Sequence, residues 1–156
     1  MKRGTMNILI VAFAQNFRAD SKNIEIENKI ANFIKDKSNN SACFFLAETR
    51  YGEEPEKGTY AWQPWSRLAT YLQNFNFIFS QGIEWDCPYY INDFYKSKTN
   101  EPIEQIIITG NLTPIEYIKL GSLLQSYFLN IPIKFTDFYQ VAPTEILKQM
   151  DIEIEK

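Results

Sequence analysis

The chain has 156 residues, of which 45% are hydrophobic and 22% charged, and its formal net charge is -3. At this length one core can bury about two-thirds of the unfolded surface, so the composition predicts a single domain over residues 1–156 and excludes a disordered or collagen-like chain. The acidic balance argues against long nucleic acid and anionic membranes as partners, and no apolar stretch is long enough for a membrane span.

Histidine is absent from the sequence. This excludes His-based catalytic triads, His-zinc sites and two-histidine RNA cleavage, so any catalysis must use carboxylates, Lys, Tyr, Ser, Thr or Cys. Cys43 and Cys87 are too few for a disulfide framework, and the residues before the first apolar run are too short for a signal peptide. We therefore expect a cytoplasmic protein, and we expect neither a metal nor a cofactor.

The first third of the chain predicts two buried strands separated by a helix. Residues 8–13 are continuously apolar, which is typical of a central parallel strand covered on both faces. Apolar residues recur at helical spacing over 26–34 and precede a Lys-Ser-Asn-Asn-Ser turn. Residues 41–49 contain a second apolar run and predict the second strand.

The middle of the chain is less regular. Residues 50–63 form a charged loop punctuated by Gly and Pro, long enough to be a lid. An apolar stripe that follows a proline predicts a helix over 64–75, and a short strand is expected over 75–80. For residues 81–100 we expect an aromatic-rich loop with a short helix over 91–96.

The last third returns to alternating strands and helices. Residues 103–109 predict a strand, an amphipathic helix follows, and 130–135 predict a final parallel strand. Residues 143–150 predict a short helix, and 151–156 a tail that frays or pairs. This order predicts an α/β, Rossmann-like three-layer fold with a mostly parallel central sheet.

Ligands in such folds gather at the carboxyl ends of the strands. That rule places residues 14–18, 50–63 and 109–113 around one crevice. Gly110 lets the backbone approach a ligand, and Thr113 with Glu116 matches a capping box whose free amides favour a phosphate. The same motif is also typical of a well-capped helix after a tight turn. No Walker motif and no glycine-rich dinucleotide fingerprint is present.

The Thr-Gly strand end, the Asn/Thr-containing turn, the amphipathic helix and the closing Asn-Ile-Pro-Ile-Lys-Phe segment resemble the end of a CARF domain. CARF domains sense cyclic oligoadenylates in type III CRISPR antiviral signalling, and small stand-alone members include ring nucleases. The resemblance covers residues 7–18 and 103–138. The turn departs from the family pattern because the second glycine and the lysine are missing.

This resemblance implies a homodimer that binds a cyclic oligoadenylate across its two-fold axis. The protein either cleaves the ring or binds it uncut. Cleavage would use the ring's own 2'-hydroxyl, which is held in line with the phosphate without a metal. The residues implied to contact the ring are Gln15, Asn16, Thr109, Gly110, Asn111 and Thr113. The side chains implied to supply positive charge are Arg18, Arg50 and Lys134.

Two other functions remain open from the sequence. The closing unit of the chain also resembles that of nucleoside deoxyribosyltransferase-like and TIR-like folds, because Glu116 precedes Gly121 and an Asn-Ile-Pro-Ile strand follows. In those folds a Glu acts at the ribose C1', so Glu116 would be catalytic. Alternatively, the aromatic-rich surface belongs to a non-enzymatic defence or anti-defence protein that blocks a partner.

Overall fold

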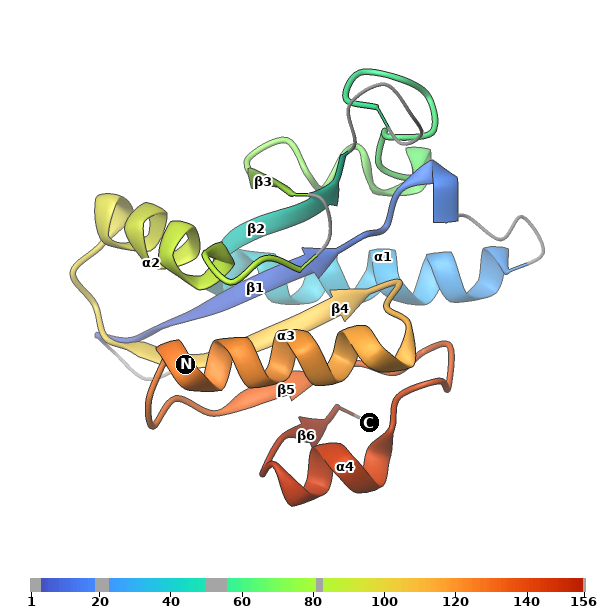
Figure 1. The fold of residues 1–156 in the computed structure, drawn as a ribbon. Helices are drawn as coiled ribbons and strands as arrows, with labels where there is room; N and C mark the ends of the chain where they lie inside the picture. The colour runs from blue at the N-terminus through green and yellow to red at the C-terminus, as the bar shows by residue number, and fades with distance from the viewer. Residues whose placement is uncertain (1–3, 19–22, 50–55, 81–82, 156) are drawn as a thin grey trace.

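The computed structural model describes residues 4–18, 23–49, 56–80 and 83–155, and these contain a six-stranded sheet flanked by helices on both faces (Figure 1). The strands are β1 (Met6–Ala12), β2 (Ser41–Glu48), β3 (Asn76–Ser80), β4 (Ile103–Gly110), β5 (Ile133–Phe135) and β6 (Glu153–Ile154). The α-helices are α1 (Ile24–Lys37), α2 (Cys87–Lys98), α3 (Pro114–Tyr127) and α4 (Thr144–Gln149). Three 3-10 turns are η1 (Asn16–Arg18), η2 (Ser38–Asn40) and η3 (Ser66–Leu68).

The strand order is β3-β2-β1-β4-β5-β6, and every neighbouring pair is parallel. The predicted α/β, Rossmann-like three-layer fold is therefore confirmed. Chain order reverses between β1 and β4, so the carboxyl ends of these two strands border the topological switch point where α/β folds bind ligands.

Strand β1 lies at the centre of the sheet and is buried on both faces. Ile8 and Ile10 pack in the cluster that also holds residues of α2, α3 and α4, whereas Val11 packs with residues of α1 and η3. All three side chains are fully buried. Burial on both faces explains why the sequence of this strand is continuously apolar rather than alternating.

Two residues end the central strands in the left-handed region of backbone conformation. Phe13 has φ 58° and turns the chain from β1 toward η1, where a non-glycine residue pays a conformational cost. Gly110 has φ 135°, and a Cβ built there would lie 2.1 Å from the carbonyl oxygen of Ala12. Only glycine therefore allows β4 to end against the backbone of β1.

The predicted helix over 64–75 is wrong in form. The structure has η3 followed by turns, with bonds such as that from the Tyr71 N–H to the Leu68 carbonyl. The cause lies at Trp65, which is extended, donates its backbone N–H to Ala14 and donates its indole N–H to the carbonyl of Gln15. These bonds hold the segment to the end of β1 and leave little room for a regular helix.

Helix α2 is longer than predicted, since most of 81–100 was expected to be a loop. Pro88 occupies the first turn of the helix, and Ile91 and Tyr95 share its buried face. No helix in the described part of the chain has both the length and the apolar character needed to cross a bilayer.

The predicted lid over 50–63 is described only from residue 56 onward, because residues 50–55 lie outside the described ranges. Its described part packs against η1. The backbone N–H groups of Asn16 and Phe17 donate to the carbonyls of Gln63 and Ala61, each at 2.8 Å.

Candidate functional site

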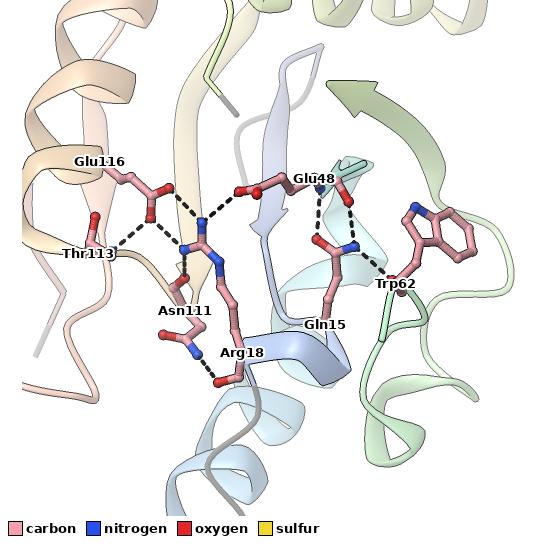
Figure 2. Close-up of polar contacts among 7 residues, drawn as sticks. All are labelled: Gln15, Arg18, Glu48, Trp62, Asn111, Thr113 and Glu116. Atoms are coloured by element: carbon pink, nitrogen blue, oxygen red, sulfur yellow. Dashed lines mark hydrogen bonds and ion pairs between the residues drawn. The ribbon is translucent and has the colours of Figure 1, made fainter. Parts of the chain in front are cut away.

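Three charged side chains meet at the carboxyl edge of the sheet (Figure 2). Arg18 comes from η1, Glu48 ends β2, and Glu116 lies in the first turn of α3. The guanidinium donates to both oxygens of Glu116, at 2.6 and 2.7 Å, and to Oε1 of Glu48 at 3.0 Å. It also donates to the carbonyl of Asn111 at 2.9 Å. We call these three charged residues the Arg18 cluster.

The Arg18 cluster is largely withdrawn from water. The side chains of Arg18, Glu48 and Glu116 are 15%, 7% and 14% exposed. Taking charges out of water is costly, and only close pairing with good geometry offsets that cost. The guanidinium carbon also lies 4.4 Å from the centre of the Phe13 ring, a cation-π contact that packs the apolar side of the group.

The Arg18–Glu116 pair is held in its charged form. Burial alone would raise the pKa of Glu116, but the hydrogen bonds from Arg18 and from the Thr113 backbone, together with the guanidinium charge, lower it below its ordinary value. Burial alone would likewise lower the pKa of Arg18, and the carboxylates of Glu116 and Glu48 raise it instead. A buried cation between two acids at a switch point is the kind of perturbed group that marks functional sites.

Gln15 fixes the position of Glu48. It is fully buried, and its side-chain amide donates to the carbonyl of Glu48 at 3.0 Å and accepts from the N–H of the same residue at 2.8 Å. It also donates to the carbonyl of Trp62 at 2.7 Å. The side chain thus continues the β1–β2 pairing beyond the point where Phe13 turns away (Figure 2).

Asn111 and Thr113 fix the other side of the cluster. The Asn111 amide donates to the backbone carbonyl of Arg18 at 2.9 Å. Thr113 and Glu116 form the predicted capping box at the start of α3, and the Thr113 N–H donates to Glu116 Oε1 at 2.9 Å. Glu116 therefore caps its own helix while it pairs with Arg18.

The remaining residues named from the sequence lie elsewhere. Asn16 donates to the carbonyl of Tyr60 at the surface, and the buried Thr109 hydroxyl bonds that of Thr136 at 2.7 Å. Lys134 on β5 forms ion pairs with Glu153 and Glu155 and takes no part in the Arg18 cluster. Arg50 lies outside the described residues.

Glu48 was not singled out from the sequence. A signal was present, since an acid closes the apolar run of residues 42–47 at the carboxyl end of a buried strand. Its two partners, Gln15 and Arg18, precede it by about thirty residues, so the pairing depends on the packing of β2 against β1.

A cavity of about 460 Å³ is lined by residues of η1, the 56–75 segment and β3. Its lining includes Asn16, Tyr60, Gln63, Gln73 and Phe77 and none of the residues of the Arg18 cluster. Its volume is within the range of small-molecule pockets.

Neither cysteine lies in the Arg18 cluster. Burial raises the pKa of Cys43 to about 11 and that of Cys87 to about 12, so both thiols stay protonated near neutral pH. Within the described ranges, no group of three or more Cys, Asp or Glu side chains is arranged to hold a metal ion.

Comparison with solved structures finds similar folds, among them two hydrolases. The isochorismatase-like hydrolase of Alkaliphilus metalliredigens matches with a TM-score of 0.62 and 12% identity, covering 97% of this chain and 94% of that one. The nicotinamidase of Staphylococcus aureus matches with a TM-score of 0.69 and 16% identity, covering 99% of each chain. No protein-family profile and no curated sequence matches the chain.

These matches overturn the functional reading of the sequence. The identification as a CARF-like ring nuclease that binds cyclic oligoadenylate in type III CRISPR signalling was wrong, since the similar structures are hydrolases of another kind. The deoxyribosyltransferase-like, TIR-like and non-enzymatic alternatives gain no support from them either. At this level of identity the likeness shows the fold alone. The chain has the fold of the isochorismatase-like hydrolase and of the nicotinamidase along nearly its whole length.

Proposed function

We propose that this chain is a hydrolase of small molecules and that the Arg18 cluster is its reaction centre. The observation that carries the proposal is the convergence of one cation and two acids, all largely buried, at the switch point of the sheet. The likeness to two hydrolase structures over nearly the whole chain supports this reading.

The two acids have different roles in this proposal. Glu116 accepts two hydrogen bonds from Arg18 and one from the Thr113 N–H, and its lowered pKa makes it a weak base. It therefore orients Arg18. Glu48 accepts one longer bond from Arg18 through Oε1, so a substrate oxygen can replace it there at lower cost.

In the proposed reaction, a substrate carbonyl oxygen binds Arg18 Nη2 in place of Glu48. Glu48 then accepts a proton from a water molecule while the water oxygen forms a bond to the carbonyl carbon. The bond to the leaving group breaks, and the proton passes from Glu48 to that group. Arg18 stabilises the negative charge that develops on the carbonyl oxygen.

This mechanism uses water because the described chain offers no better nucleophile there. Both thiols are buried away from the cluster with a raised pKa, and the sequence has no histidine. The free state of both cysteines also suits a reducing compartment, so our proposal places the enzyme in the cytoplasm.

The test is an assay of the wild-type protein against a panel of small amides and esters that includes nicotinamide. The measured quantity is the release of ammonia from the amides and of acid from the esters. We expect turnover of at least one class, and a loss of about 100-fold or more in kcat for Glu48→Gln. Glu25→Gln is the matched control, because Glu25 is exposed on α1 and pairs only loosely with Lys29, at 3.8 Å.

Two results would contradict the proposal. One is the absence of turnover across the whole panel by the folded wild-type protein. The other is turnover that Glu48→Gln and Glu25→Gln leave equally unchanged. Circular dichroism on each variant ensures that a loss of rate is not a loss of fold.

A further inference from the structure

We propose that two copies of this chain form a dimer by pairing their β3 strands antiparallel, which joins the two sheets into one. Strand β3 lies at the end of the strand order and pairs with β2 on one side. Within the described residues its other side has no strand partner. This inference is independent of the proposed hydrolase function.

The backbone directions in β3 follow from one hydrogen bond. The Thr49 N–H donates to the carbonyl of Ser80 at 2.7 Å, so the backbone groups of Ser80 point toward β2. Because these directions alternate along a strand, those of Ile78 also point toward β2, and those of Phe77 and Phe79 point outward. The outer edge of β3 therefore presents the N–H and C=O groups of two phenylalanines.

A groove of about 160 Å³ follows this edge and is bordered by aromatic rings on both faces of the sheet. Phe77 and Phe79 line it together with Ile78, and Tyr90 and Phe94 from α2 line it from the other face. Phe79, Tyr90 and Phe94 are all exposed. A groove centred on a strand edge fits another extended strand better than it fits a helix or a compact ligand.

The strand itself lacks the sequence features with which proteins prevent strand addition, although Lys57 from the preceding segment lies over the Phe79 ring, with its Nζ 4.4 Å from the ring centre. Residues 76–80 read Asn-Phe-Ile-Phe-Ser and contain no charge and no proline, and β3 pairs with β2 in unbroken register without a bulge. Edge strands that must stay unpaired usually carry such features.

The sequence of the edge is complementary to itself, which is why we assign a second copy as the occupant. A two-fold axis through Ile78 places Phe77 of each copy opposite Phe79 of the other. The outward N–H and C=O groups of Phe77 in one copy then exchange hydrogen bonds with those of Phe79 in the other, as in a hydrogen-bonded antiparallel pair. The paired phenylalanines lie on one face of the joined sheet, where cross-strand aromatic pairs are favourable.

The test is sedimentation velocity of the full chain over a concentration series, with two substitutions of Phe79, one that keeps the backbone donor and one that removes it. Phe79→Thr removes the ring but keeps the outward N–H, whereas Phe79→Pro removes both and leaves the bonds to β2 intact. We expect a dimer for the wild type, a weaker dimer for Phe79→Thr, and a dissociation constant at least about tenfold higher again for Phe79→Pro.

Leu129→Lys is the control, since Leu129 is 71% exposed and lies at the end of α3, away from the edge. It should leave the dimer unchanged. A second variant, Phe79→Lys, keeps the test decisive if the proline variant does not fold, because it removes the aromatic pair with Phe77 of the other copy and adds to the strand edge the kind of charge that protects edge strands from pairing. A wild-type chain that is monomeric at every concentration overturns the proposal, as does a dimer that Phe79→Pro and Phe79→Lys leave intact.

Discussion

Arg18 joins three segments that are far apart in sequence, since from η1 its guanidinium binds the end of β2 and the connection from β4 into the first turn of α3. Each of these bonds replaces water around a buried charge. The loss of one acid therefore affects more than a single pair, because Arg18 remains buried with fewer partners.

Glu116→Gln should lower the free energy of unfolding by about 2–4 kcal/mol at neutral pH, since it removes the charge that faces Arg18 in a mostly buried pair. The glutamine oxygen can still accept from the Thr113 N–H, so the helix cap is only weakened. Urea denaturation measures the effect. The exposed variant Glu25→Gln should change stability by less than about 0.5 kcal/mol.

The cost of Glu116→Gln should also depend on pH. The pKa of Glu116 is lowered in the folded state, so the unfolded chain binds the proton more readily and the acid stabilises the fold only where it is ionised. Its contribution is complete above the ordinary pKa of a glutamate, about 4.3, and disappears as pH falls through the folded pKa. The difference between wild type and variant should therefore shrink on acidification, and a constant difference would show that the pair does not titrate as described.

Part of this site could be predicted from residues alone. The rule that ligand-side loops follow parallel strands pointed to residues 14–18 and 109–113. The structure brings Gln15, Arg18, Asn111 and Thr113 from these ranges to one edge. Their partners could not be predicted. Whether Arg18 faces Glu48 or solvent depends on the turn at Phe13 and on strand pairing across the sheet, which no local pattern records.

At the scale of elements, the turn between β4 and α3 depends on close packing between strands. The space beside Ala12 accommodates no side chain at Gly110. This explains the Thr-Gly strand end without a ligand, and it shows why that short motif was a poor guide to family. Any parallel strand that ends tightly against its neighbour can require the same glycine.

Gly110→Ala should destabilise the fold by about 3 kcal/mol or more, because its Cβ would clash with the Ala12 carbonyl and its φ of 135° is unfavourable for alanine. Gly58→Ala separates the two effects. Gly58 also has a positive φ, of 91°, but nothing lies within 4 Å of the added Cβ, so only the conformational cost of about 1 kcal/mol is expected. Equal losses in thermal unfolding would contradict the packing argument.

Elements with a strong local pattern were predicted well, and those anchored by tertiary bonds were not. The apolar runs of β1, β2 and β4 and the capping box of α3 lie where the sequence indicates. The 64–75 segment has a helical apolar stripe, yet the two bonds of Trp65 to the end of β1 override it.

At the scale of the whole molecule, both thiols report on global unfolding. Cys43 and Cys87 are buried, and burial raises the pKa of each thiol, to about 11 and about 12. We expect both to react with a thiol reagent at neutral pH only at the rate at which the fold opens, and to react fully in denaturant. Fast labelling of either thiol in native buffer would contradict the packing described for its strand or helix.

The fold class was predictable because alternating strands and helices suffice for a parallel three-layer arrangement. The likeness in fold to hydrolase structures was not predictable, since at 12% and 16% identity what the chains share is the path of the backbone. Strand order places β1 between β2 and β4, and that information lies in long-range pairing rather than in any segment.

The central position of β1 has a consequence for the chain as it leaves the ribosome. Ile8 pairs with Ala42 on one side but with Ile106 on the other, so roughly one hundred residues are synthesised before the second side can close. At about 5–20 residues per second that interval lasts about 5–20 seconds. During it β1 has one backbone edge open, so the central pairing of the sheet is completed only after β4 has left the ribosome.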